Sequence, residues 1–150
     1  GGLFLAGVVM AAAIALHNLP EGMVIGASYA ADLAEAGEDG RMMALVIGLH
    51  NIPEGMAVAV PLAAGGASRG RAVLTTAAAG APTVLGAVLG FCLGTMGPGL
   101  QMLTLGGASG AMLYVVFGEL LPESFRLCRS PAPVMAAVLG VLTGMGVVLG

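Results

Sequence analysis

The chain has 150 residues, of which 58% are hydrophobic and only 9% charged, and its formal net charge is −3. A soluble globular domain carries roughly 25% charged residues, so this composition excludes an ordinary water-soluble protein. The chain has five arginines, no lysine and no basic patch, so no nucleic-acid partner is expected.

Five long apolar segments follow one another along the chain, separated by linkers rich in glycine, proline or charge. Several exceed the ~20 apolar residues that a helix needs to cross a bilayer, and they lack the period-2 alternation of barrel strands. We therefore expect an all-α, polytopic transmembrane helix bundle that forms a single domain over residues 1–150. The expected spans are about Leu3–Ala31, Met42–Ala64, Ala72–Thr95, Met102–Pro122 and Ala132–Gly150.

The first two spans carry nearly the same motif near their middles, HNLPEG at 17–22 and HNIPEG at 50–55. In each copy the histidine and the glutamate are four residues apart, so they share a helix face, and the asparagine lies on the adjoining edge. Pro20 and Pro53 each lack an N–H, which bends the helix and frees a carbonyl oxygen one turn earlier. Because consecutive spans run antiparallel, the pair forms a short inverted repeat, which often places a substrate site at the bilayer midplane.

Ionisable residues at the bilayer centre cost about 2.5 kcal/mol or more on insertion scales, so these side chains need a reason to be there. Two carboxylates and two imidazoles brought together would balance the charge of one dication. This donor set suits zinc, and also iron(II), manganese, cobalt or cadmium, whereas calcium and magnesium favour oxygen ligands alone. The asparagine amides are expected to complete the coordination or to bind a hydrated ion, and no other cofactor is expected. The predicted metal ligands are His17, Asn18, Glu21, His50, Asn51 and Glu54.

Each motif copy alone has a second interpretation, as a hydrogen-bonded core histidine with a protonated core glutamate. Two matching copies at equal depth on adjacent spans favour the metal site. An enzyme is not expected, because Asn18 and Asn51 stand where the general-base glutamate of an intramembrane HExxH protease would be. The alternative functions are a proton-coupled carrier or channel for another solute, with the His/Glu pairs as a relay, and a metal-dependent intramembrane hydrolase.

Small residues recur at four-residue spacing in the third span, at Gly86, Gly90 and Gly94, and in the fifth, at Gly140 and Gly144. This spacing is typical of closely packed transmembrane helices. We expect the glycines to pack inside one bundle. The alternative is the seam of a homodimer.

The arginines indicate the orientation of the chain. Arg69 and Arg71 lie in the second linker and Arg126 and Arg129 in the fourth, on the same side of the membrane, against only Arg41 on the other. Short arginine-rich loops stay cytoplasmic. Residue 1 is therefore expected on the cytoplasmic side and the C-terminus outside.

The two motifs resemble those in the fourth and fifth helices of the ZIP (Zrt/Irt-like) metal transporters, especially the bacterial GufA-like branch, and residues 107–124 resemble the seventh helix. The resemblance runs over essentially the whole chain. It implies a part of a longer protein, holding spans four to eight of eight. It also implies a transporter that moves divalent metal, zinc foremost, toward the cytoplasm across a bacterial inner (plasma) membrane.

By this resemblance the six polar motif residues match the transport-site ligands, and many relatives hold two metals there with the glutamates bridging. The chain departs from those relatives in one place. Where the sixth helix of such relatives has a glutamate before a proline, this chain has Ala81 before Pro82. The second metal position would thus lose a carboxylate, so we expect one metal, with Ala81→Glu raising the count toward two.

A second pair of carboxylates, Glu119 and Glu123, is spaced four residues apart around Pro122. One interpretation, favoured by the family pattern, is an exit-path relay for metal leaving toward the cytoplasm. The other is an interfacial carboxylate pair in which Glu123 partners Arg126. The sequence leaves both open.

Overall fold

The computed structural model describes residues 2–35 and 37–149, without the side chains of residues 119, 120, 123, 127 and 147–149. The regular structure of these ranges is helical, which confirms the expected all-α class. Its elements are α1 (Gly2–Glu35), α2 (Asp39–Ala64), α3 (Arg69–Thr95), α4 (Pro98–Val115), the π-helical turn η1 (Val116–Leu120), α5 (Leu121–Leu127) and α6 (Ala132–Leu149).

Four helical segments are long and apolar enough to cross a membrane: Gly2–Glu35, Asp39–Ala64, Arg69–Thr95 and Pro98–Gly118. A further apolar helix, Ala132–Gly146, is shorter over the described side chains. Many large apolar side chains point outward, including Leu16 at 77% and Leu74 at 72% exposure. A soluble protein buries such residues, so this pattern fits a multi-pass membrane protein whose helices face lipid.

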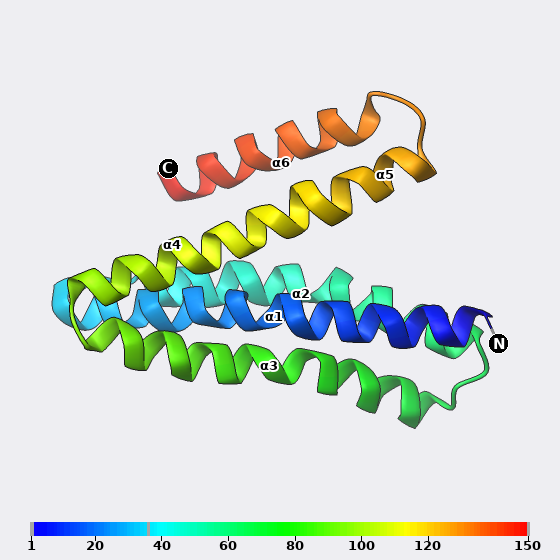
Figure 1. Ribbon diagram of the computed structural model, residues 1–150, viewed down its shortest axis with the longest axis horizontal. Helices are drawn as coiled ribbons and strands as arrows, with labels where there is room; N and C mark the ends of the chain where they lie inside the picture. Colours follow the sequence, from blue (N-terminus) through cyan, green and yellow to red (C-terminus); the bar gives the residue numbers. More distant parts are fainter. Residues whose placement is uncertain (1, 36, 150) are drawn as a thin grey trace. The chain divides into compact units, whose positions relative to one another are not determined.

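The chain divides into two compact units, one ending at Met112 and the other beginning at Leu113. In the first unit α1 lies between α2 and α3 and packs against both (Figure 1). A small apolar core joins the three helices. It consists of Ala11 from α1, Val58 and Leu62 from α2, and Ala72 and Ala79 from α3.

Glycines on α1 let its backbone lie directly against that of α3. A Cβ added at Gly22 would overlap the carbonyl oxygen of Thr83, and one added at Gly26 would overlap that of Ala87. No side chain, however small, fits at these two positions unless the helices move apart. Gly22 is the last residue of the first motif copy, so this contact fixes that copy against α3.

The facing surface of α3 is built in the same way. A Cβ at Gly86 would overlap the carbonyl oxygen of Leu19, and one at Gly90 would overlap that of Met23. Gly94, one turn further, lies against Ala30. Small residues at four-residue spacing permit this kind of close approach. The predicted packing of the α3 glycines inside one bundle is therefore confirmed.

The second predicted glycine pair has a different outcome. Within the described residues no atom lies within 4 Å of a Cβ added at Gly140 or Gly144. Close packing of this pair and the homodimer seam both stay predictions.

The second unit contains a helix that continues past its proline. The predicted fourth span ended at Pro122, but helical structure continues to Leu127. Pro122 has no N–H to donate to the carbonyl of Gly118. Just before it the chain widens into the π-helical turn η1, and the N–H of Leu121 donates to the carbonyl of Val116, five residues earlier. The widened turn accommodates the proline, so the helix continues past it, and the membrane span predicted to end at Pro122 stays a prediction.

Because the backbones of α1 and α3 are in contact, replacing a glycine at this contact by alanine should destabilise the protein more than the same change elsewhere in α3. Gly26→Ala should lower the free energy of unfolding by about 1–3 kcal/mol, because the methyl group forces the two backbones apart. Gly70→Ala in α3 is the control, because no atom lies within 4 Å of its added Cβ. The control should change stability by at most about 0.5 kcal/mol. Thermal unfolding of the full-length protein in detergent measures both, and equal melting temperatures for the two variants would contradict the packing.

Candidate metal centre

Both motif copies lie near the middle of a long helix, residues 17–22 in α1 and 50–55 in α2. The two helices run antiparallel beside each other in the first unit (Figure 1). The inverted repeat expected from the sequence is therefore present as two neighbouring half-sites that face a common centre.

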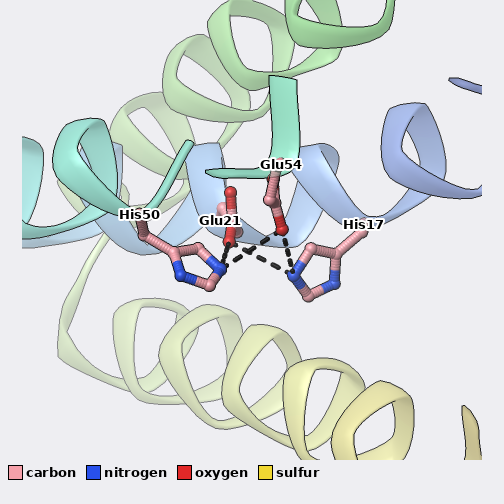
Figure 2. Close-up of side chains that lie close together, drawn as sticks. All are labelled: His17, Glu21, His50 and Glu54. Carbon is pink, nitrogen blue, oxygen red and sulfur yellow. Dashed lines mark ion pairs between the residues drawn. The ribbon is translucent and has the colours of Figure 1, made fainter. Parts of the chain in front are cut away.

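The two histidines and two glutamates point toward one another (Figure 2). His17 Nε2 lies 3.2 Å from Glu21 Oε1 and 3.5 Å from Glu54 Oε1. His50 Nε2 lies 3.2 Å from Glu54 Oε1 and 3.5 Å from Glu21 Oε1. All four atoms lie within 4.8 Å of one another. Each imidazole thus contacts a carboxylate of its own helix and one of the neighbouring helix.

The four His–Glu separations are compatible with the geometry of a four-coordinate zinc ion. Zinc binds imidazole nitrogen and carboxylate oxygen at about 2.0–2.2 Å, so neighbouring ligands on a tetrahedron are about 3.3–3.6 Å apart. The four His–Glu distances are 3.2–3.5 Å. Four of the six edges of a coordination tetrahedron are therefore already close to the right length.

The four side chains differ in their exposure to solvent. Glu21 is fully buried and the His17 side chain is 10% exposed, whereas the Glu54 side chain is 16% and the His50 side chain 52% exposed. An ionised carboxylate buried this deeply needs a compensating positive charge. The α1 half of the cluster is therefore its closed side, and the centre is most open at His50.

The two motif asparagines have different surroundings. Asn18 is buried, and its Nδ2 donates to the carbonyl oxygen of Ala79 in α3 at 2.9 Å. Nothing in the sequence pointed to this partner. The Asn51 amide oxygen faces Glu21 Oε2, and only with the amide turned over would its nitrogen donate to Glu21 Oε2 at 3.1 Å and to the carbonyl of Ile47 at 3.3 Å. An amide binds a metal through its oxygen, and that of Asn18 is buried without a hydrogen-bond partner among the described residues. The roles of both asparagines as metal ligands stay predictions.

A cavity of about 90 Å³ adjoins the cluster and is lined by residues of α1, α2 and α3, including Asn18 and Glu54. This volume exceeds the roughly 10–15 Å³ that a cavity needs to hold one water molecule. On α3 its lining residues are Thr76, Ala79 and Gly80. Ala81 is exposed and is not one of them. The α3 position next to the site is thus Gly80, which changes the prediction made for Ala81.

The predicted exit-path pair, Glu119 and Glu123, flanks Pro122 at the π-helical turn and the helix that follows it. The side chains of both glutamates lie outside the described part of the chain. Both interpretations of this pair therefore stay predictions.

Comparison with known proteins agrees with this geometry. The family model described as "ZIP Zinc transporter" matches residues 1–150. The chain belongs to the ZIP zinc transporter family. The zinc transporter GufA of Myxococcus xanthus is 40% identical over 114 residues, which cover 76% of this chain and 44% of that relative. The matched region thus spans less than half the length of the relative. No solved structure matches the chain significantly.

The cluster predicts the first coordination shell of bound zinc. X-ray absorption at the zinc edge of the full-length protein should show about four nitrogen or oxygen ligands at about 2.0–2.2 Å, with scattering from two imidazoles. His50→Ala should remove one imidazole contribution. Sulfur at about 2.3 Å, or a shell of oxygens without imidazole, would contradict the assignment.

Proposed function

We propose that this ZIP-family chain forms the central metal-binding site of a divalent metal transporter, with His17, Glu21, His50 and Glu54 as ligands and zinc as the main substrate. The observation that supports this most strongly is the set of His–Glu distances of 3.2–3.5 Å, which suits tetrahedral zinc. The name of the Myxococcus xanthus relative points to the same ion. Iron(II), manganese, cobalt and cadmium are the other candidate substrates.

The depth of the cluster supports a site at the bilayer midplane. In α2, residues 39–49 precede His50 and residues 55–64 follow Glu54, which makes 11 and 10 residues respectively. At 1.5 Å per residue, each end of the helix is about 15 Å from the cluster. A bilayer core is about 30 Å thick, so both surfaces lie beyond the reach of a direct contact with the site. The metal would thus rest halfway across.

The balance between the charge of the ion and that of the two glutamates supports a role of the site in transport. A bare dication at the midplane would carry a large electrostatic cost, and so would two ionised glutamates. When Glu21 and Glu54 bind the dication, the complex has no net charge, while the neutral imidazoles add donors without adding charge. Transport toward the cytoplasm, in a bacterial inner membrane with residue 1 on the cytoplasmic side, is part of the proposal. The arginine-rich linkers at Arg69–Arg71 and Arg126–Arg129 support this orientation.

A proton-coupled carrier or channel for another solute uses the same side chains in a different way. A proton relay needs His–Glu contacts but no convergence of four donor atoms on one point. The convergence favours metal, and no catalytic role is proposed because Asn18 and Asn51 occupy the positions where a hydrolase of the HExxH type needs its base.

Uptake measurements test the transport function. Full-length protein in proteoliposomes should take up zinc, followed with a zinc-sensitive dye inside the vesicles. The double variant Glu21→Ala/Glu54→Ala should show only the leak of protein-free vesicles, because both charge-balancing ligands are lost. Glu35→Gln, an exposed acid at the end of α1, is the matched control and should transport normally. If zinc uptake survives in the double variant, the transport-site assignment is wrong.

We also propose that the site holds one metal, because α3 contributes no carboxylate to the cavity beside it. Gly80 lines the cavity and has no atom within 4 Å of an added Cβ. Gly80→Asp should therefore place a carboxylate beside Glu54 and raise the zinc bound per protomer from about one toward two. Ala81→Glu, outside the lining, should stay near one. Elemental analysis gives both counts, and two metals in the unmodified protein would overturn the proposal.

A further inference from the structure

The N-terminus of α2 is capped by a residue of the preceding helix. Both oxygens of the Asp32 carboxylate, near the end of α1, accept backbone N–H groups at the start of α2. Oδ1 accepts from Asp39 at 2.9 Å and Oδ2 from Gly40 at 2.8 Å. These N–H groups have no partner within their own helix, and the start of a helix favours an anionic acceptor. We call this arrangement the Asp32 clamp.

The start of α3 shows how a cap within one helix differs from this clamp. The hydroxyl of Ser68, directly before α3, accepts the N–H of Arg71 at 3.4 Å and so stabilises the first turn of its own helix. At α2 the equivalent residue, Glu38, makes no capping hydrogen bond with its side chain. The acceptor comes instead from α1, where the chain turns from one helix to the next (Figure 1). The clamp therefore joins two helices.

Close packing beside the clamp leaves the start of α2 little freedom to move. Gly40 is buried, and a Cβ added to it would lie 2.6 Å from Tyr29 Cγ and 2.9 Å from Asp32 Oδ2. A Cβ added at Gly37, in the linker, would lie 3.0 Å from Asp32 Oδ1. The backbone at the start of α2 thus lies directly on the last turns of α1.

The clamp and the metal cluster share one register of the two antiparallel helices. Glu21 lies 11 residues from Asp32 along α1, and His50 lies 11 residues from Asp39 along α2. At 1.5 Å per residue, both ligands are about 16 Å from the clamp. Glu21 Oε1 and His50 Nε2 consequently face each other across the helix pair, 3.5 Å apart.

The other contact between the helices follows the same count. His17 and Glu54 each lie 15 residues from the clamp, one on each helix, and His17 Nε2 is 3.5 Å from Glu54 Oε1. A slide of α2 by the rise of one residue would displace both of its ligands by about 1.5 Å, which is most of a zinc–ligand bond of about 2.0–2.2 Å. Both contacts therefore depend on the register that the clamp holds.

We propose that Asp32 is a positioning residue for the metal cluster, acting from the end of α1 by holding α2 in the register that pairs the ligands of the two helices. Two hydrogen bonds to neighbouring N–H groups oppose both a slide and a turn of α2. Asp32 acts through the helices and does not touch the ion. This inference rests on the proposed metal site.

Replacing the clamp residue tests its effect on metal binding. Asp32→Ala removes both acceptors, so the zinc affinity of the full-length protein should fall by about 10-fold. Asp32→Asn keeps one acceptor oxygen and should fall less. Glu35→Ala removes an exposed acid three residues later and, as the matched control, should bind zinc like the parent. Competition with a chromogenic chelator in detergent measures all three, and equal affinities of Asp32→Ala and Glu35→Ala would overturn the proposal.

A longer linker separates positioning from simple capping of α2. Two glycines inserted after Gly37 should change zinc affinity by less than about 3-fold while Asp32 is present, because the clamp still holds α2 and a longer loop costs little. For a residue that only caps α2, Asp32→Ala would lower the affinity by the same factor with either linker. For a positioning residue, the loss should be about 10-fold larger with the long linker, because neither the clamp nor the short linker then holds the register.

Equal losses with the two linkers would overturn the positioning role. Asp32→Asn carries the same comparison if the alanine variant does not fold, because it keeps the shape of the side chain. If the unmodified protein binds no zinc, the proposed metal site is wrong and this inference fails with it. If the unmodified protein binds zinc and the Asp32 variants bind it equally well, only the positioning role fails.

Discussion

The close approach of α1 to α3 is the constraint on which the rest of the first unit depends. Backbone carbonyls of each helix lie where a side chain of the other would be, at Gly22 and Gly26 on one side and Gly86 and Gly90 on the other. This contact follows immediately after Glu21 in the sequence. It removes that carboxylate from solvent and leaves the α2 side as the open face of the cluster.

Burying a carboxylate is unfavourable unless something compensates its charge, so the glycine contact and the metal chemistry are two parts of one arrangement. The tight α1–α3 interface makes Glu21 fully inaccessible. His17 from α1 and His50 from α2 lie around it, at separations that a dication can bridge. A looser interface would admit water and would reduce both the cost of the empty site and the energy gained when the ion binds.

Much of this arrangement could be predicted from local sequence features. Long apolar runs reveal helices in a membrane, and the i, i+4 spacing of His17 and Glu21 places both on one face in any helix. The second copy of the motif predicted that His50 and Glu54 on α2 complete the cluster. What could not be predicted depends on contacts between distant segments. The Asn18–Ala79 hydrogen bond joins residues 61 positions apart, and no local pattern marks an ordinary alanine carbonyl as its acceptor. The continuation of the helix past Pro122 was also not predicted, because a π-helical turn before this residue lets the helix continue where a proline usually ends one.

The unequal surroundings of the two copies suggest why an inverted repeat is useful even when its symmetry is broken. A symmetric site would hold both carboxylates equally and would have no preferred ligand to release first. Here Glu21 is fully enclosed, whereas Glu54 is 16% exposed, borders a cavity and keeps its Oε2 without a hydrogen-bond partner among the described residues. In the proposed transport, the ion must be bound tightly enough to leave water but weakly enough to leave the site. One fixed carboxylate and one with room to move satisfy both demands with two copies of the same motif.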